Sequence, residues 1–505
     1  MFDLDYHALL PEGILAITVL VTLVVDLVTR KKQLVAVTAM VGMFAALVPV
    51  ATLAFCDSLD VCTSTGAERI LFDGSYVVDG YSLVLKAVFI FAAFVVLLMS
   101  VGYLGSDRYY EGEYYFLLVA STLGAVVMAS SRDFITMIVA LELVTGPAFL
   151  LSGWRKGDSK SNEAALKFFI TGVLALALTL FGVSLLYGLT GSQQFDGIAA
   201  AASSLEEVPL FVLGVIFVLV GFGFKVSAVP FHFWTPDTYQ GAPPPVTAWL
   251  SVGSKGAGFV GLLSIAYLAL PSVASIWGPL LWVVAATSMF IGNLVAIKQT
   301  NVIRLLGYSS IAQAGFMLAP FGASAASGAD DLSVQFAATV TYFIIYAVMN
   351  LGAFAVVIVI GSRLGSYELE DWGGLNLYAP GLALGLAAFF MSLAGIPPLA
   401  GWFAKFAMFT ATIGVGNWWG YSIAIVAALN AVIAFVYYAK VVKAAFFDPV
   451  PDGVDVAMLE DVPVPGPIGF ALGLTAFGVI LLGVYPPLAA NLGEFTVQIF
   501  ASAGL

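Results

Sequence analysis

Residues 221–243 read GFGFKVSAVPFHFWTPDTYQGAP, and within this stretch residues 229–236 interrupt an apolar segment at 208–240. Such a segment is long enough to cross a bilayer, which takes about 20 mostly apolar residues in a helix. Pro230 and Pro236 each remove a backbone donor and clash with the preceding turn, so the helix should break there. Broken backbone at membrane depth is tolerated only where protein buries it or where it lines a hydrated cavity. The stretch therefore predicts a discontinuous transmembrane helix beside a polar path.

The composition of the whole chain indicates a membrane protein. Of its 505 residues, 61% are hydrophobic and 10% are charged, whereas an ordinary soluble domain carries roughly 25% charged residues. Fourteen segments are apolar enough to span a bilayer, and they are long and Gly-rich without strict alternation, which favours helices over a β-barrel. These segments cover roughly residues 11–29, 33–55, 77–105, 113–131, 133–153, 162–190, 208–240, 244–270, 275–297, 301–321, 334–362, 378–412, 419–447 and 466–492.

A second segment, at 378–412, is interrupted by the sequence GIPPLAG, in which the prolines are Pro397 and Pro398. The two interrupted segments are the seventh and the twelfth, and broken helices in corresponding positions indicate an inverted repeat around an ion path. We therefore expect an all-α polytopic membrane protein with two inverted five-helix repeats in a single transmembrane domain over 1–505. In this division, three N-terminal helices occupy 1–112, helices 4–8 occupy 113–270, helices 9–13 occupy 275–447, and the fourteenth helix occupies 466–492.

The flanks of the first segment argue against a cleaved signal peptide. Asp3, Asp5 and Glu12 precede it, where a signal peptide has a basic region, and a basic run at 30–32 follows it. With the N-terminus outside, the positive-inside rule is obeyed along the chain. The inside loops then hold Arg30, Lys31, Lys32, Arg108, Arg155, Lys156, Lys160, Lys298, Arg304 and Arg363, whereas the outside loops hold Arg69 and Arg132. Both termini are therefore expected on the outer side of the membrane.

Several classes of site find no support in the sequence. It contains no Walker motif, dinucleotide fingerprint, CxxC or HExxH, and its two histidines make a haem or metal site unexpected. The net charge of −12 includes a proline-rich acidic segment at 448–461, which we interpret as a solvated loop or a partner contact, and no basic patch suits nucleic acid. Cys56 and Cys62 lie in or beside the first outside loop, where a disulfide and two free thiols are equal alternatives.

Charges inside the predicted spans are the informative residues, because each costs about 2.5–3.5 kcal/mol at the bilayer centre. Glu142 lies in the middle of the fifth segment, and Lys225 lies one turn before Pro230. Lys255 lies among glycines and serines of the eighth segment, and Lys405 follows the second break. Three of these charges have a structural alternative. Glu142 could be a carboxylate held by a structural partner, and Lys225 a snorkelling lysine near a helix end. The small residues around Lys255 could serve helix packing alone.

Lysine suits proton transfer, because its free pKa of about 10.4 falls on burial and rises again beside a carboxylate. Arginine would stay protonated. The pattern therefore predicts a proton relay through the four charged residues. His232, at the first break, is either a bridge to the second half of the chain or a hydrogen-bonding loop residue. Lys167, in the sixth segment, is expected to tune the pair formed by Glu142 and Lys225.

The stretch at 221–243 resembles the signature of the antiporter-like subunits of respiratory complex I, which are related to Mrp-type cation/proton antiporters. The resemblance extends over nearly the whole chain and includes Glu142, Lys255 and the sequence AGIPP at 394–398 with Lys405. Within this family the chain is most similar to the N-type subunits. L-type subunits are longer and end in a lateral helix, and M-type subunits typically have a glutamate where this chain has Lys405.

The resemblance implies a proton-translocating membrane subunit of an NADH-quinone oxidoreductase in a bacterial-type plasma membrane. Glu142 and Lys225 would form the modulating pair, Lys255 the central relay, and Lys405 the terminal donor or acceptor toward the outside. NADH, FMN, Fe–S clusters and quinone would then belong to partner subunits, namely the other membrane subunits and the hydrophilic arm, and this chain would hold no cofactor.

Two alternatives use the same residues. One is an Mrp-type Na⁺/H⁺ antiporter subunit with the same fold and the same buried charges. The other is a mainly structural membrane subunit whose lysines are held in ion pairs.

Overall fold

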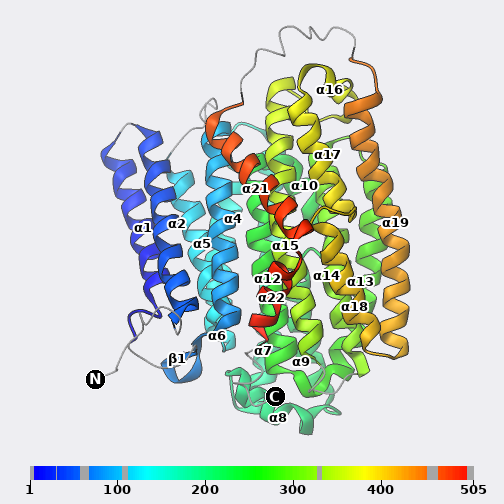
Figure 1. Ribbon diagram of the computed structural model, residues 1–505. Coiled ribbons are helices and arrows are strands. Elements are labelled where there is room, and N and C mark those ends of the chain that lie inside the picture. The colour runs from blue at the N-terminus through cyan, green and yellow to red at the C-terminus, as the bar shows by residue number, and fades with distance from the viewer. Residues whose placement is uncertain are drawn as a thin grey trace.

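The computed structural model describes residues 5–29, 31–56, 68–104, 112–326, 332–451 and 464–497. The chain forms one bundle of helices that run mostly along a common axis (Figure 1). The first half of the bundle contains α1 (Leu10–Val28), α2 (Lys32–Ala54), α4 (Gly80–Leu104), α5 (Glu113–Ser130), α6 (Phe134–Ser152), α7 (Ser159–Thr190), α8 (Phe195–Leu205), α9 (Pro209–Lys225), α10 (Trp234–Gly241), α11 (Pro244–Trp249) and α12 (Lys255–Ser264). The second half contains α13 (Ala274–Ile297), α14 (Val302–Ala323), α15 (Ser333–Leu364), α16 (Leu375–Tyr378), α17 (Pro380–Ala394), α18 (Gly401–Gly414), α19 (Trp418–Phe447), α21 (Gly466–Val484) and α22 (Pro487–Thr496).

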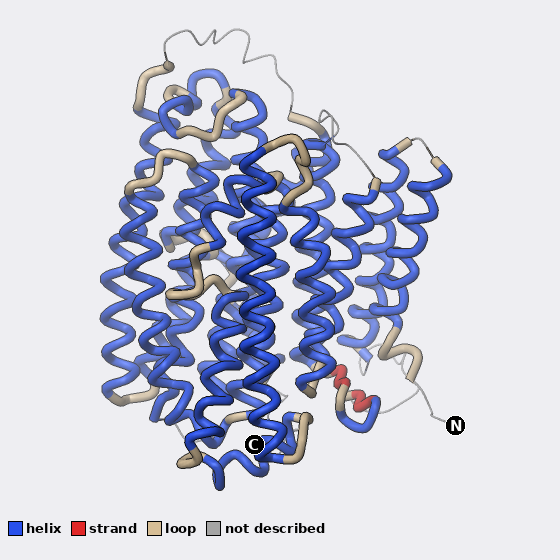
Figure 2. The backbone as a smooth tube through the Cα atoms, turned by 180° about the vertical axis from the view of Figure 1, so that it is seen from behind, coloured by secondary structure: helices blue, strands red, loops and turns tan. Residues whose placement is uncertain are grey.

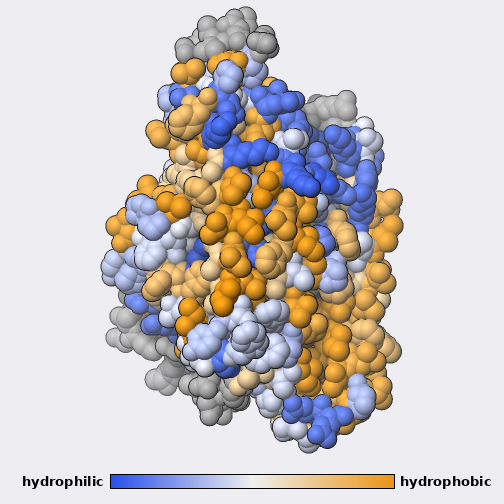
Figure 3. Space-filling view, turned by 90° about the vertical axis from the view of Figure 1, so that its right-hand side faces the viewer, coloured by the Kyte–Doolittle hydropathy of each residue, from blue (hydrophilic) through white to orange (hydrophobic). Residues whose placement is uncertain are grey.

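The predicted multi-pass architecture is confirmed. Among the described residues, twelve helices are long and apolar enough to cross a membrane, and the two predicted broken segments supply shorter apolar pieces. Figure 3 shows one face on which apolar residues dominate the middle, with hydrophilic residues gathered toward its ends. The boundaries of the two five-helix repeats stay a prediction.

Both predicted helix breaks are present. The first separates α9 from α10 at residues 226–233, and the second separates α17 from α18 at residues 395–400. Figure 2 shows loop segments about halfway along the bundle, among the helices. The prediction for Pro236 was wrong in detail, because α10 begins at Trp234 and Pro236 lies in its first turn. A first-turn proline loses no helical hydrogen bond, since that N–H has no partner within the helix.

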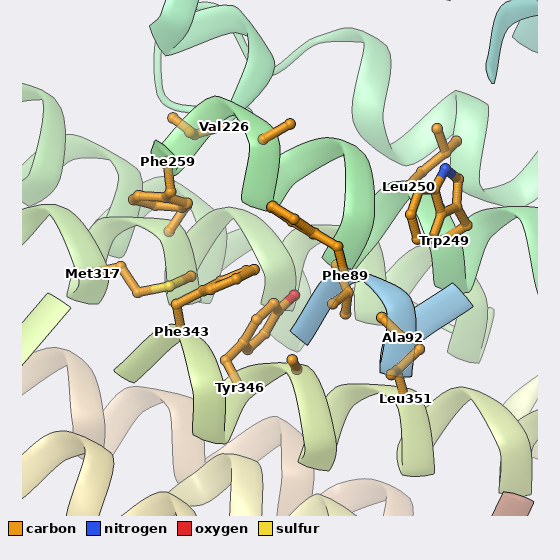
Figure 4. Packing of buried hydrophobic residues seen from close by; sticks show 14 of the residues in the cluster. Phe89, Ala92, Val226, Trp249, Leu250, Phe259, Met317, Phe343, Tyr346 and Leu351 are labelled. Carbon is orange, nitrogen blue, oxygen red and sulfur yellow. The ribbon is translucent and has the colours of Figure 1, made fainter. Parts of the chain in front are cut away.

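The eighth span is the innermost helix of the bundle. It consists of α11, the π-helical turn η2 (Leu250–Ser254), α12 and a second π-helical turn, η3 (Ile265–Ala269), and its most apolar 18-residue window is entirely buried. Its glycines permit this packing, because a Cβ on Gly256 would lie 2.3 Å from Phe343 and 2.8 Å from Phe89. Figure 4 shows Phe89 of α4 and Phe343 of α15 close to this helix. The lysine that begins α12 is therefore placed deep in the protein.

Three features were not predicted. Strands β1 (Arg69–Leu71) and β2 (Tyr76–Val78) pair antiparallel at one end of the bundle. The polar stretch at 191–207 contains α8, which buries Phe195, Ile198 and Ala202 on one face. The fourteenth span is shorter than expected, because α21 ends at Val484 and α22 begins at Pro487.

Candidate functional site

Glu142 and Lys225 come together at the first break. Lys225 is the last residue of α9, and its side chain is 3% exposed. Its Nζ lies 3.9 Å from Oε1 of Glu142 on α6 and donates a hydrogen bond of 2.5 Å to Oγ1 of Thr145, nearly one turn further along the same helix. The ion pair is therefore loose, and a neutral hydroxyl is the nearest acceptor of the ammonium.

Lys255 lies at the first position of α12, directly after η2, and is 1% exposed. Its Nζ donates to both the carbonyl oxygen and Oγ of Ser310 on α14, at 2.9 Å each. Among the described residues it forms no ion pair with a carboxylate. A Cβ atom on Gly253 would lie 2.5 Å from Trp249, and one on Gly258 would lie 2.9 Å from Cβ of Lys225, so these glycines let the eighth span pack closely against its surroundings.

Lys405 binds the second break itself. Its Nζ donates a hydrogen bond of 2.5 Å to the carbonyl oxygen of Ala394, the last residue of α17, and lies 5.2 Å from the ring centre of Phe316. The next residue, Gly395, has a φ of +92°. A Cβ atom there would lie 2.8 Å from Cδ and 3.1 Å from Nζ of Lys405. The break thus supplies a carbonyl that α17 leaves unpaired and a glycine that makes room for the ammonium.

The two auxiliary residues lie apart from the Glu142–Lys225 pair. Lys167 binds Asp237 and Glu163, at 2.6 Å each. Asp237 also binds Arg304 at 2.6 Å. His232 is half-buried at the first break with its ring against exposed Phe233, and its Nδ1 has no hydrogen-bond partner among the described residues. Among the described residues, no hydrogen bond joins His232 to Lys225 or Lys255, and its role as a bridge stays a prediction.

The sequence did not predict the neutral side chains that bind Lys225 and Lys255, and it did not predict a further buried ion pair. Thr145 and Ser310 are buried hydroxyl residues in apolar spans, which are common and carry no distinctive signal. Lys86 of α4 is fully buried and lies 2.8 Å from Glu12 of α1. Its charge within a predicted span was visible in the sequence, but its partner lies more than seventy residues away.

The described residues give limited information on the predicted metal, disulfide and loop features. Among the described ranges, no group of three or more His, Cys, Asp or Glu side chains is placed to hold a metal ion. Cys56 is disulfide-bonded, but Cys62 lies outside the described residues, so their pairing stays a prediction. Most of the acidic segment at 448–461 also lies outside them, as do Arg30 and Arg108.

The sequence matches the family model described as "NADH:quinone oxidoreductase/Mrp antiporter, TM" over residues 131–430. The NADH-quinone oxidoreductase subunit N 2 of Streptomyces griseus subsp. griseus is 40% identical, in an alignment that covers 100% of this chain and 94% of that protein. The NADH-quinone oxidoreductase subunit N of Trichlorobacter lovleyi is 32% identical, with 98% of each chain covered.

Solved structures agree with this assignment. A chain of respiratory complex I from Thermus thermophilus, solved with bound aureothin, has a TM-score of 0.75 and 28% identity, with 96% of this chain and 99% of that chain covered. A chain of the Mrp complex from Dietzia sp. has a TM-score of 0.82 with 98% and 97% covered, and at 21% identity it shows a shared fold. The chain therefore belongs to the NADH:quinone oxidoreductase/Mrp antiporter family and, within it, to the N subunits of NADH-quinone oxidoreductase.

Proposed function

We propose that this chain carries protons across the membrane through Glu142, Lys225, Lys255 and Lys405, in that order toward the outside. Electron transfer from NADH to quinone in partner subunits, which hold FMN and the Fe–S clusters, drives the transfer by changing the interaction of Glu142 with Lys225. Each elementary charge moves against about 2.3 kcal/mol per 100 mV of membrane potential.

The observation that carries the proposal is the kind of acceptor that each lysine has. The three ammonium groups are buried, and their hydrogen bonds go to a threonine hydroxyl, to a serine hydroxyl and carbonyl, and to the carbonyl of Ala394. At Lys255 and Lys405, neutral oxygens solvate the ammonium without a fixed counter-charge, whereas Lys225 also has the carboxylate of Glu142 at 3.9 Å. A proton can then leave without stranding a buried carboxylate, which would be strongly unfavourable. A purely structural lysine would be expected in a tight ion pair.

The exposure of Glu142 supports a neighbouring membrane subunit as partner. Its side chain is 36% exposed, although Ile135, Val139 and Leu150 on the same helix are exposed apolar residues typical of a membrane-facing surface. A carboxylate facing lipid is costly. We therefore assign this surface of α6 to a contact with another membrane subunit of the complex, which would complete the surroundings of Glu142.

The arrangement of the helix ends agrees with the predicted orientation. The first residues of α1 and the last residues of α22 lie at the same end of the bundle (Figure 1). An even number of crossings gives this result. Together with the distribution of basic residues, it supports both termini on the outer side of a bacterial-type plasma membrane.

The test is charge removal in the assembled complex. We expect Lys225→Ala and Glu142→Ala to lower the number of protons translocated per NADH oxidised, measured in vesicles or proteoliposomes, while the complex still assembles. The matched control is Lys443→Ala, because Lys443 is 66% exposed and pairs with Asp448 at the surface; it should pump normally. Full pumping by an assembled Lys225→Ala complex would contradict the relay and favour a structural role.

The second candidate, Na⁺/H⁺ exchange of the Mrp type, is favoured only by the shared family model and fold. Pumping that requires Na⁺ in the assay, or Na⁺ movement coupled to proton movement by this subunit, would support it. Pumping that is unchanged in Na⁺-free buffer would exclude it.

A further inference from the structure

A run of buried polar groups leads from Lys255 to an amide in the second half of the bundle. Lys255 binds Ser310 on α14, and the hydroxyl of the preceding residue, Ser309, lies 2.6 Å from Oη of Tyr438 on α19. Oη of Tyr438 accepts a hydrogen bond of 3.1 Å from Nε2 of Gln313, one turn further along α14. These five side chains are at most 1% exposed. The run therefore lies entirely inside the protein.

The same amide reaches the residues that hold Lys405. Nε2 of Gln313 also donates to the carbonyl oxygen of Leu393 at 3.1 Å. The adjacent carbonyl, that of Ala394, accepts the hydrogen bond from Lys405. Oη of Tyr342 on α15 donates to Oε1 of Gln313 at 2.7 Å. A backbone carbonyl can only accept, so the nitrogen of the amide must face Leu393, and three hydrogen bonds fix the side chain in this orientation.

The chemistry of the amide differs from that of the hydroxyl groups beside it. Between Ser309 and Tyr438 either oxygen can be the donor, so a proton received on one side can be passed on at the other by reversing the bond. The amide of Gln313 donates with its nitrogen and accepts with its oxygen, and it cannot exchange these roles. The carbonyl of Leu393 has no proton to pass on. In this arrangement, a proton that reaches Tyr438 has no route through Gln313.

We infer that Gln313 is a gate between the Lys255 and Lys405 sites. Its hydrogen bonds hold it between Tyr438, whose other partner is the residue next to Ser310, and the carbonyl of Leu393, which is next to the one that binds Lys405. In this position it blocks direct proton transfer between the two sites. A proton passes only when the side chain turns away from Tyr438 and Leu393 and water takes its place. Gln313 thus acts on the path between Lys255 and Lys405 and prevents pumped protons from flowing back at rest.

The inference rests on the proposed relay, and the experiment is passive proton conductance, which needs no catalysis. The whole complex is reconstituted in proteoliposomes without NADH, a K⁺ diffusion potential is imposed with valinomycin, and proton entry is followed with an enclosed pH dye. Gln313→Ser shortens the side chain, makes room for water and supplies a hydroxyl. We expect it to raise the proton conductance about tenfold, which corresponds to lowering the barrier by about 1.4 kcal/mol.

The matched control is Gln335→Ser. Gln335 on α15 is also buried, and its Nε2 donates to the carbonyl of Ala411 at 3.4 Å, away from the relay lysines. It should leave the conductance unchanged. A conductance of Gln313→Ser equal to wild type would overturn the inference, and so would an equal rise in both variants, which would indicate general loosening of the bundle.

Two further variants keep the test decisive. If Gln313→Ser does not assemble, Tyr342→Phe removes only the hydroxyl that holds Oε1 of Gln313 and should give a smaller rise; no rise would overturn the gate. Adding Lys255→Met to a leaking gate variant separates the two proposals. Loss of the leak supports both, whereas a persisting leak would overturn the gate between Lys255 and Lys405, because protons would then pass Gln313 without using Lys255.

Discussion

Gly395 decides, as a single residue, whether Lys405 can reach the second break. An alanine there would be strained by its positive φ, by about 1–2 kcal/mol, and its Cβ would displace the ammonium from the carbonyl of Ala394. We expect Gly395→Ala to lower both the thermal midpoint of the purified complex and its proton pumping per NADH. Gly414→Ala is the control on the same helix as Lys405, because no heavy atom lies within 4 Å of its added Cβ. Normal pumping by Gly395→Ala would show that this contact is dispensable.

The charged residues of the site could be predicted from the sequence, but their partners could not. Glu142, Lys225, Lys255 and Lys405 stand out because a charge in an apolar span is unfavourable. The hydroxyl and carbonyl groups that receive their hydrogen bonds come from helices distant in sequence, and a serine or threonine in a span is too common to be informative. Gln313 was overlooked for the same reason, since an uncharged amide does not interrupt an apolar pattern.

Three elements meet at Asp237, whose carboxylate joins α10 to Lys167 of α7 and Arg304 of α14. We expect Asp237→Asn to destabilise the complex by about 1–2 kcal/mol, after allowance for solvent screening of partly exposed Lys167, because two cations lose their shared acceptor. The measurement is the thermal midpoint of the purified complex. Asp448→Asn is the control, since the Lys443–Asp448 pair is exposed, and it should change the midpoint little. Equal shifts in the two variants would refute the bracing role of Asp237.

The elements themselves were predictable to different degrees. Long apolar runs gave the spans, and prolines gave the two breaks, because both signals are local. Pro236 misled the prediction because a proline breaks a helix only beyond its first turn. The interruption between α21 and α22 was readable at Pro486 and Pro487 but was masked by the apolar residues around it. Helix α8 was missed because the surrounding stretch is polar. Its few apolar residues do recur at helical spacing, but they do not form a long apolar run.

The Glu12–Lys86 pair joins the N-terminal helices to the rest of the molecule. Lys86→Met would leave a buried carboxylate without its counter-charge, which costs about 3–5 kcal/mol. We expect faster amide hydrogen exchange in α1 and α2 of the assembled complex carrying this variant. The double variant Glu12→Gln/Lys86→Met should recover most of the protection. If the single and double variants exchange alike, the pair does not hold these helices.

For the whole molecule, composition and charge distribution were enough to predict a bundle of many membrane-spanning helices. The bilayer fixes the length and polarity of each span and the side on which basic loops lie. Composition and charge distribution did not single out the surface of α6 that we assign to a contact with another subunit. Glu142 was predicted as an interior charge, and its partial exposure emerges only when the helices are assembled. A docking surface in a membrane looks like a lipid-facing surface in sequence, since both are apolar.

The hydrogen bond from Lys405 to the carbonyl of Ala394 makes the broken helix and the buried charge dependent on each other. A continuous helix would use that carbonyl internally and leave the ammonium without its acceptor. An apolar residue in place of the lysine would leave the carbonyl without its donor. A chain with only the helix break, or only Lys405, would therefore be less stable than a chain with both. In this chain the proline break and Lys405 therefore stabilise each other, and a change at either one is expected to require a compensating change at the other.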